Sequence, residues 1–414
     1  MKLAVIMPPV YTMPPVSGGG IERLADTFCR QNESAADPLD ITVFSRGEEK
    51  DAPENPYIHT KFTYINVTRS EPPSNRFDQI LHGDKNGTRF DYLKEIQKHL
   101  KAEKFDRILL EDCFEFAKYL DGEKILHAHH RFFDLEKSAS DRGADKAIGF
   151  RKRFDKVNKF IFPSEFMKKQ AVSLGVPDGK CSIVHDAVDL SVFDPERFSD
   201  VRAEKRAKYR LGDDDILGVF VGRLTPERGA VEIVKAVASS EYQASAMKLL
   251  IVGSSEYGAD IRDEYREQLE SAAPAVDFQN PDEQFAGKVI FIGSVKARST
   301  ARFLSRADFA VVPSVADEAG GLPVLEAMAC GLPLVISDSG ALAEYVGELA
   351  GTDNCIVVKR GLGYAENLRR AIDKLSDDLH EHPEKRGTIA KNAREHSAGF
   401  SGDKFYAEMR DVIG

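Results

Sequence analysis

The residues best equipped for chemistry lie in the string DEAGGLPVLEAMACG, residues 317–331. A proline near its middle and a glycine at its end predict a short helix preceded by Gly320 and Gly321. The unpaired backbone amides at such a helix start attract phosphate. Glu318 before the helix and Glu326 about one turn inside it could accept hydrogen bonds from sugar and ribose hydroxyls. A capped helix with solvated acids is the plain alternative.

Two arginines occupy a second loop, which follows the apolar run Ile216–Val221. Arg223 and Arg228 are five residues apart, and a guanidinium makes bidentate contacts with phosphate oxygens. The pair could therefore clamp a diphosphate from one side. Arginines are also common in solvated loops, and the local sequence alone leaves that alternative open.

A run of three glycines lies between the first expected strand and the first expected helix, in Ser17–Arg23. Gly19 and Gly20 lead into the helix, where a backbone without side chains can approach phosphate or sugar closely. The spacing differs from the G-x-G-x-x-G pattern of dinucleotide-binding folds.

Three histidines close another expected strand, in Leu126–Arg131. His127 and His129 have a spacing that can hold zinc, but no third ligand is apparent nearby in the sequence, so no metal site is predicted. One of the two imidazoles could instead hydrogen-bond a reacting sugar.

Strands and helices alternate along nearly the whole chain, which is typical of βαβ units around parallel sheets. The pattern breaks near Val188–Tyr209 and then restarts, which predicts an α/β protein of two domains. Residues 48–73 and 74–88 are expected to be irregular excursions from the first domain. The strands are expected at Leu3–Met7, Ile41–Phe44, Arg107–Leu110, Ile125–His127, Phe160–Phe162, Ser182–Val184, Ile216–Val221, Lys248–Val252, Val289–Ile292, Phe309–Val312, Leu334–Ile336 and Ile356–Val358.

Parallel sheets bind ligands beyond the carboxyl ends of their strands. The four motifs all follow expected strands, so two such domains would bring them to the two sides of one cleft.

The composition narrows the class of protein. The chain has 414 residues, which favours two domains, and a formal net charge of -10, which argues against a nucleic-acid binder. Its five cysteines are widely spaced and suggest neither a disulfide framework nor a zinc site. No stretch reaches the ~20 apolar residues of a membrane span, and the apolar N-terminus stops at two prolines. We therefore expect a cytoplasmic protein.

Taken together, these motifs resemble the family-four retaining glycosyltransferases of the GT-B fold, glycosyl transferases group 1. Glu318 and Glu326 match the family's E-x7-E motif, and Gly222–Gly229 is similar to its G-R-L…K-G segment with Arg228 in place of lysine. Gly19–Glu22 looks like its N-terminal Gly-Gly loop. The segment 186–189 reads Asp-Ala-Val-Asp where the family has Asn-Gly-Val-Asp.

The resemblance implies two Rossmann-like domains facing each other across a cleft. The acceptor domain would span 1–188, the donor domain 189–397, and a C-terminal helix at about 398–414 would pack back on the first domain. No metal and no cofactor is implied.

It also implies the roles of the site residues. Arg223 and Arg228 would hold the donor diphosphate, and His129, or alternatively His127, would be the active-site histidine. Gly19 and Gly20 would also contact the donor, and the backbone amides of Gly320, Gly321 and Leu322 would bind its sugar or phosphate. Glu318 would bind the sugar hydroxyls, and Glu326 would bind the ribose.

The implied reaction moves a hexose from a nucleotide-sugar to an acceptor hydroxyl with retention, in polysaccharide or glycoconjugate synthesis. The acceptor would be a carbohydrate, a lipid-linked molecule or a small molecule. A non-hydrolysing nucleotide-sugar epimerase and a non-catalytic sugar-nucleotide-binding protein are the alternatives.

The stretch 150–160, FRKRFDKVNKF, carries five basic residues and three phenylalanines in an acidic chain. It could contact an anionic membrane peripherally, at the inner face of the membrane. The plain alternative is a surface helix whose phenylalanines face the core.

Overall fold

A computed structural model describes the protein over residues 1–15, 19–48, 50, 53–67, 88–130, 151–198, 209–212, 214–242, 244, 246–255, 263–272 and 288–414. The contacts divide the chain into unit 1, residues 1–185 with 402–414, and unit 2, residues 186–401. The sequence had placed these boundaries at 188 and 398. Ser17, Gly18, Arg131, Phe150 and the excursion 74–87 fall outside the described residues.

Unit 1 is built on a seven-stranded parallel sheet in the order β3-β2-β1-β4-β5-β6-β7. Its strands are β1 (Lys2–Ile6), β2 (Asp40–Arg46), β3 (Thr60–Ile65), β4 (Arg107–Glu111), β5 (Lys124–His127), β6 (Lys159–Phe162) and β7 (Cys181–Ile183). The α-helices among its described residues are α1 (Gly20–Glu33), α3 (Thr88–Ala102), α6 (Glu165–Ser173) and α15 (Gly402–Ile413). The central strands are short and apolar because helices cover both faces of a parallel sheet.

Unit 2 repeats the plan with a six-stranded parallel sheet in the order β10-β9-β8-β11-β12-β13. Its strands are β8 (Ile216–Val221), β9 (Met247–Val252), β10 (Val289–Gly293), β11 (Phe309–Val312), β12 (Leu334–Ser337) and β13 (Cys355–Val358). Its α-helices are α8 (Ala230–Ala238), α9 (Glu264–Ala272), α10 (Ala301–Leu304), α11 (Leu322–Ala329), α12 (Leu342–Val346), α13 (Tyr364–Glu381) and α14 (Lys385–Ala398). The predicted α/β class with two Rossmann-like domains is confirmed.

The core of unit 2 lies where α8 and α13 pack against the sheet. Apolar side chains of both helices, such as Ile233 and Leu368, are fully buried with those of β8 and β9. Burial of such side chains stabilises by roughly 1.5–3 kcal/mol each. This packing holds the strand ends, and hence the loops that follow them, in fixed positions.

One part of the sequence-based fold is wrong. The segment 48–73 was expected to be irregular, but it contains β3, which pairs with β2 over six residues. β3 is the edge strand of its sheet, and its side chains are mostly only half-buried. An edge strand needs no continuous apolar run, so its sequence, TKFTYI, carries little of the signal expected of a buried strand.

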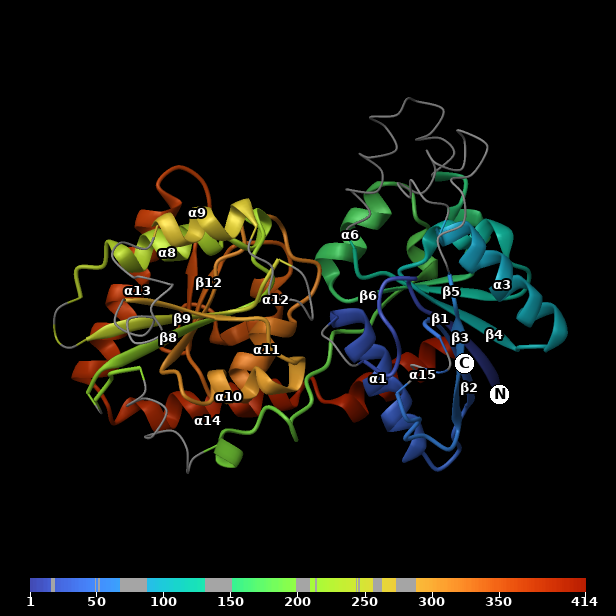
Figure 1. Ribbon diagram of the computed structural model, residues 1–414, viewed down its shortest axis with the longest axis horizontal. Coiled ribbons are helices and arrows are strands. Elements are labelled where there is room, and N and C mark those ends of the chain that lie inside the picture. The colour runs from blue at the N-terminus through green and yellow to red at the C-terminus, as the bar shows by residue number, and fades with distance from the viewer. Residues whose placement is uncertain are drawn as a thin grey trace. The chain divides into compact units, whose positions relative to one another are not determined.

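The C-terminal helix α15 packs against α1 within unit 1 (Figure 1). The rings of Phe28 and Tyr406 lie 5.2 Å apart. The Tyr406 hydroxyl also donates to the buried side chain of Asn32 at 2.8 Å, and Asn32 in turn bonds both backbone groups of Leu39. The last residues of the chain therefore belong to the first folding unit.

Over its described residues, 151–160, the basic stretch is not the continuous surface helix that was considered for it. In its described part a short 3-10 turn, Phe154–Lys156, is followed by β6. Phe154 and Phe160 are buried, whereas Arg151, Lys152 and Lys156 are exposed. Within the described residues, no helix combines the length and the apolar character that crossing a bilayer requires.

Candidate active site

The candidate site of unit 2 lies beyond the carboxyl ends of β8 and β11, which are neighbours in the middle of the sheet. The chain runs outward from β8 to β9 and β10, and from β11 to β12 and β13, so this is where the strand order reverses. Open α/β sheets bind ligands at such a switch point. The loop of Arg223 and Arg228 follows β8, and the loop of Glu318 follows β11.

Close backbone contact joins these two loops. The carbonyl of Glu227 accepts hydrogen bonds from the amides of Val315 and Ala316 at 2.8 and 3.1 Å. Gly229 has a left-handed backbone with φ of 71°. A Cβ on this residue would lie 1.9 Å from the carbonyl oxygen of Pro313. Only glycine permits this approach, so the register between the two loops depends on it.

The loop contact brings two predicted site residues together. Arg228 Nη1 lies 2.5 Å from Glu318 Oε1, and the same oxygen accepts a hydrogen bond from the Ser314 hydroxyl. The Glu318 backbone is held from the other side, because its carbonyl accepts from the Ala341 amide at 2.9 Å. Gly340 approaches that backbone so closely that a Cβ would lie 2.2 Å from its carbonyl oxygen. Loops from three strands thus fix Glu318.

Arg360 braces the same loop from beyond β13. Its guanidinium donates to Asp317 at 2.7 Å, to Asp338 at 3.0 Å and to the carbonyl of Val315 at 2.7 Å. Partial burial would lower the pKa of Arg360, but these two carboxylates raise it overall. A planar donor with several acceptors locks the loop ahead of Glu318 in one shape.

The start of α11 is packed more tightly than its glycines suggest. A Cβ on Gly320 would lie 2.1 Å from a carboxylate oxygen of Asp186, and one on Gly321 would lie 2.2 Å from the ring of Tyr345. The Gly321 amide donates to Asp186 at 3.1 Å. The two glycines therefore make room for neighbouring side chains. Their predicted contact with a donor stays a prediction.

The buried carboxylate of Asp186 sits at the positive end of a helix, a favourable place for an anion. Asp186 also donates its backbone amide to the Tyr345 hydroxyl at 2.9 Å. Burial and the nearby Asp186 carboxylate raise the pKa of Tyr345 well above its usual value. This is the position at which the chain departs from the family's asparagine, and the structure shows the carboxylate in use as a helix cap.

Three further predicted donor residues belong to the same region of unit 2. Leu322 is the first residue of α11, and Glu326 lies in its second turn with only 4% of its surface exposed. A carboxylate this deeply buried is not the solvated acid of the plain alternative. Arg223 is half-buried in the loop after β8.

Unit 1 carries a second cluster, at the ends of β4 and β5. Glu111 and His127 end these strands and pair in register. His129 Nε2 lies 2.7 Å from Glu111 Oε2, and His127 Nδ1 lies 3.1 Å from the same oxygen. Burial alone would raise the pKa of Glu111, but the two imidazoles outweigh it and hold the pKa at about 2. Glu111 is therefore an ionised partner for both histidines.

The backbone around His129 is also fixed. Asp112 adopts a left-handed conformation with φ of 55°, which is uncommon outside glycine and costs free energy. Its carboxylate accepts from the amides of His129 and His130 at 3.0 and 3.1 Å. Glu111 thus orients the His129 ring, and Asp112 orients its backbone.

The glycine loop of unit 1 is close to this cluster. Glu22 folds back over Gly19, where a Cβ would lie 2.0 Å from its carboxylate oxygen. Burial raises the pKa of Glu22, and the charges of His129 and Glu111 act on it with opposite signs. Gly19 and Gly20, at the start of α1, thus lie near the histidine cluster. The strand that precedes them, β1, is the neighbour of β4 in the sheet.

The sequence analysis missed Glu111, Asp112, Asp186, Tyr345 and Arg360. The adjacent acids Glu111 and Asp112 carried a usable signal, because they directly follow the apolar run expected as a strand. Glu111 also supplies the third potential ligand that the His-x-His pair was thought to lack. Nothing near Asp186 or Arg360 in the sequence indicates their distant partners.

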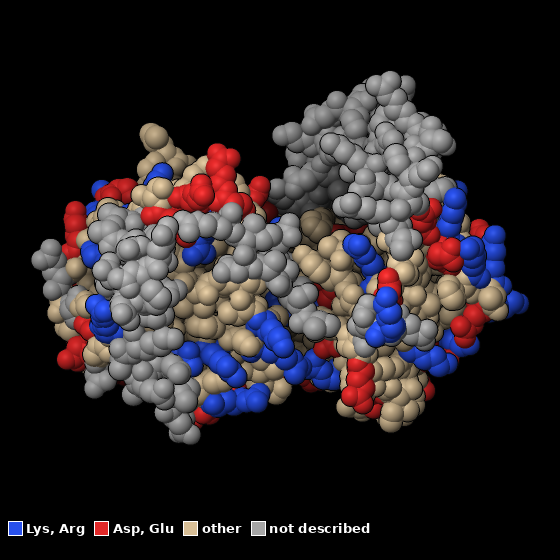
Figure 2. Space-filling view, viewed as in Figure 1, with Lys and Arg blue, Asp and Glu red and all other residues tan. Residues whose placement is uncertain are grey.

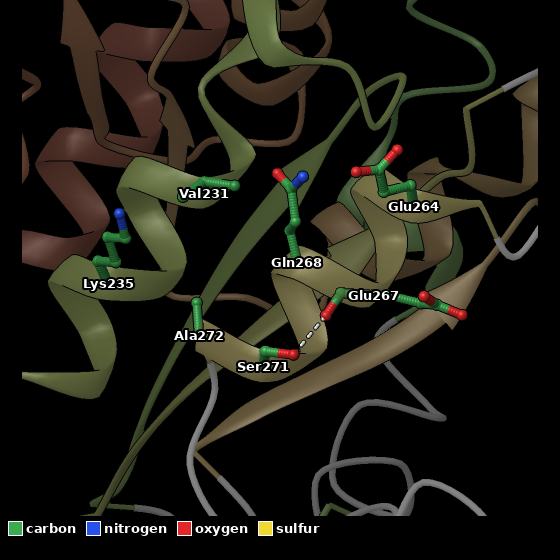
Figure 3. Close-up of a pocket in the computed structure, with 7 residues that line it drawn as sticks. All are labelled: Val231, Lys235, Glu264, Glu267, Gln268, Ser271 and Ala272. Atoms are coloured by element: carbon green, nitrogen blue, oxygen red, sulfur yellow. Dashed lines mark hydrogen bonds between the residues drawn. The ribbon is translucent and has the colours of Figure 1, made fainter.

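A separate hollow of about 410 Å³ lies on unit 2 between α8 and α9 (Figure 3). Val231 and Lys235 come from α8, and the other lining residues, Glu264, Glu267, Gln268, Ser271 and Ala272, come from α9. None of the predicted site residues lines it. We therefore place the candidate site at the strand ends.

Two family models match the chain in succession. Residues 18–192 match the model described as Glycosyltransferase Family 4, and residues 201–396 match Glycosyl transferases group 1. The putative glycosyltransferase YtcC of Bacillus subtilis is 25% identical over 96% of this chain and 87% of its own length. The D-inositol 3-phosphate glycosyltransferase of Mycolicibacterium smegmatis is 26% identical. The matched region covers 67% of this chain and 58% of that protein's length.

Solved structures share the fold. The sucrose-phosphate synthase from Thermosynechococcus elongatus superposes with a TM-score of 0.73 at 18% identity, covering 99% of this chain and 98% of the other. HepE of Anabaena in complex with UDP-glucose gives a TM-score of 0.69 at 14% identity, and the superposition covers 100% of this chain and 99% of the other.

The loop contact at Gly229 yields a prediction with a matched control. Gly229→Ala should displace the Pro313 carbonyl, lower the melting temperature and reduce sugar transfer at least tenfold. Gly363→Ala is the control, because Gly363 has the same left-handed backbone, φ of 76°, and also precedes a helix, but no atom lies within 4 Å of its added Cβ. Gly363→Ala should lower the free energy of unfolding only by the backbone strain of about 1–2 kcal/mol. Thermal melts and initial rates of both variants test this, and equal effects would contradict it.

Proposed function

The chain is a glycosyltransferase of family four with the GT-B fold, and from this premise we propose that it transfers a hexose from a nucleoside-diphosphate sugar to an acceptor hydroxyl, with retention and without a metal ion. Because the chain is a glycosyltransferase, the epimerase and non-catalytic alternatives fall away. The observation that carries the proposal is the pairing of Arg228 with Glu318 at the switch point of unit 2.

Breaking a sugar–phosphate bond leaves negative charge on the departing diphosphate. Arg228, already held in place, and Arg223 on the same loop would neutralise that charge by preorganised electrostatics. In the free protein Arg228 binds Glu318, so donor binding would replace one anionic partner by another. Glu318 would then be released toward the sugar hydroxyls, and Glu326 would bind the ribose.

Unit 1 would supply the acceptor side. The reacting sugar carries positive charge in the transition state, and His129 would hydrogen-bond it. Glu111 and Asp112 would act as positioning residues, since they fix the ring and the backbone of His129. These groups belong to unit 1, whereas the arginines belong to unit 2.

The stereochemistry and the metal requirement are tested together. With UDP-glucose as the first donor of a panel, the earliest glycoside seen by proton NMR should keep the donor's anomeric configuration, and EDTA should leave the rate unchanged. An inverted product would contradict retention. Loss of activity in EDTA that magnesium restores would contradict metal independence.

Two donor contacts give a second test. Arg223→Ala and Glu326→Ala should each lower kcat/KM by roughly 10²-fold, as expected for one lost preorganised contact. Glu326→Gln keeps the buried volume and separates loss of the charge from loss of packing. Arg302→Ala, an exposed arginine on α10, is the matched control and should behave like wild type. Near wild-type kcat/KM in Arg223→Ala would contradict the role of Arg223 at the diphosphate. The same result in both Glu326 variants would contradict the role of Glu326 at the ribose.

A lipid-linked acceptor remains part of the proposal, with a peripheral membrane contact through 150–160. Since Phe154 and Phe160 are buried, the contact would be electrostatic and would use exposed basic side chains such as Lys152. Each would add about 1 kcal/mol near an anionic surface. Figure 2 shows acidic and basic side chains interspersed on the described face of unit 1, which keeps the expected binding weak.

Liposome co-sedimentation tests this contact. Binding should rise with the fraction of anionic lipid, fall with salt, and disappear when Arg151, Lys152 and Arg153 are changed together to Glu. Hydrolysis of the donor should be unaffected by the triple change. Binding that ignores lipid charge, or no binding at low salt, would point to a soluble acceptor.

A further inference from the structure

The cluster at the ends of β4 and β5 has an unusual composition for a buried site. Glu111, His127 and His129 each offer one potential metal-ligating atom, and these atoms lie within 4.8 Å of one another. The side chains of the three residues are 3%, 1% and 9% exposed. Two imidazole nitrogens and one carboxylate oxygen therefore meet in a nearly water-free place.

The surroundings of the His127 ring indicate that this cluster could bind a cation. Neither of its ring nitrogens has a hydrogen-bond partner, although the side chain is almost fully buried. Its Nδ1 lies 3.1 Å from Glu111 Oε2 but outside hydrogen-bond geometry. A buried polar group without a partner destabilises the fold. A bound cation would supply a partner for one of the two nitrogens.

The spacing suits a small tetrahedral ion. Zinc binds histidine nitrogen and carboxylate oxygen at about 2.0–2.1 Å, which puts tetrahedral ligands about 3.3 Å apart. Two of the three pairs are 2.7 and 3.1 Å apart, so an ion would spread these two pairs by only a few tenths of an ångström. Magnesium and calcium prefer all-oxygen sites, which this cluster does not provide.

We propose that Glu111, His127 and His129 form a binding site for a divalent transition metal of the zinc class. Binding would displace the proton shared by His129 Nε2 and Glu111 Oε2, because the metal takes the deprotonated atoms. The short distances from Glu111 Oε2 to both imidazoles favour this exchange. The backbone bonds from Asp112 hold His129 in place throughout.

Occupancy would regulate the enzyme, and this part rests on the proposed function. A dication beside His129 would oppose the positive charge that develops on the reacting sugar. Zinc would therefore inhibit transfer, whereas transfer itself needs no metal. The binding site stands or falls independently of this consequence.

Calorimetric titration of the metal-free protein with zinc tests the site directly. We expect one ion per chain, with the dissociation constant raised at least tenfold in Glu111→Gln, His127→Asn and His129→Asn. His130→Asn is the matched control, because this neighbouring histidine is exposed and pairs with Asp112 outside the cluster. It should bind zinc like wild type, and millimolar magnesium should not compete.

Cobalt gives an independent readout, since its absorption spectrum distinguishes imidazole and carboxylate ligands from cysteine thiolate. A tetrahedral spectrum without a thiolate charge-transfer band supports the site, and a thiolate band overturns it. The proposal is also overturned if the wild type binds no zinc, or if zinc binding is equally tight in the three variants. Glu111→Gln keeps the shape of the side chain, and so serves if a histidine variant does not fold. Zinc binding without inhibition would leave the site in place and count against the role of His129 in transfer.

Discussion

The contact between the loops after β8 and β11 is the constraint on which the candidate site depends. Gly229 lies against the Pro313 carbonyl, and the Glu227 carbonyl accepts two amides of the facing loop. These backbone contacts set the distance between Arg228 and Glu318, which belong to different loops. The positions of the side chains at the site therefore depend on the backbone contact between these two loops.

The supporting shell around Glu318 follows from the same constraint. Arg360 braces the residue before it, Gly340 allows a third loop to reach its backbone, and Asp186 caps the helix that follows. A site used for catalysis must hold its groups within fractions of an ångström, and such a shell supplies that precision. In unit 1, Glu111 and Asp112 do the same for His129.

The sequence predicted the parts of this arrangement that local pattern controls. Buried parallel strands are short apolar runs, so β8 and β11 and the loops after them could be located, and with them Arg228 and Glu318. The edge strand β3 was missed because it is only partly buried. Asp186, Tyr345 and Arg360 were missed because each acts on a residue far away in the chain, and no local pattern records such a partner.

Gly320 and Gly321 show that the sequence provides an incomplete reason for two glycines of a motif. Their lack of side chains was read as exposure of backbone amides to a ligand, but the structure fills that space with Asp186 and Tyr345. Glu111 shows the converse, because a residue outside every motif completes the histidine cluster. Glu111 meets His127 because β4 and β5 are adjacent strands that end side by side. Asp186 and Tyr345 reach the two glycines from segments far away in the chain.

Amide hydrogen exchange with and without a nucleoside diphosphate tests the central claim most directly. A ligand that binds only the folded protein slows exchange where its contacts suppress local opening. Protection concentrated in residues 222–229 and 314–326 is the predicted result. Protection in the hollow between α8 and α9, with these two loops unchanged, would contradict the account.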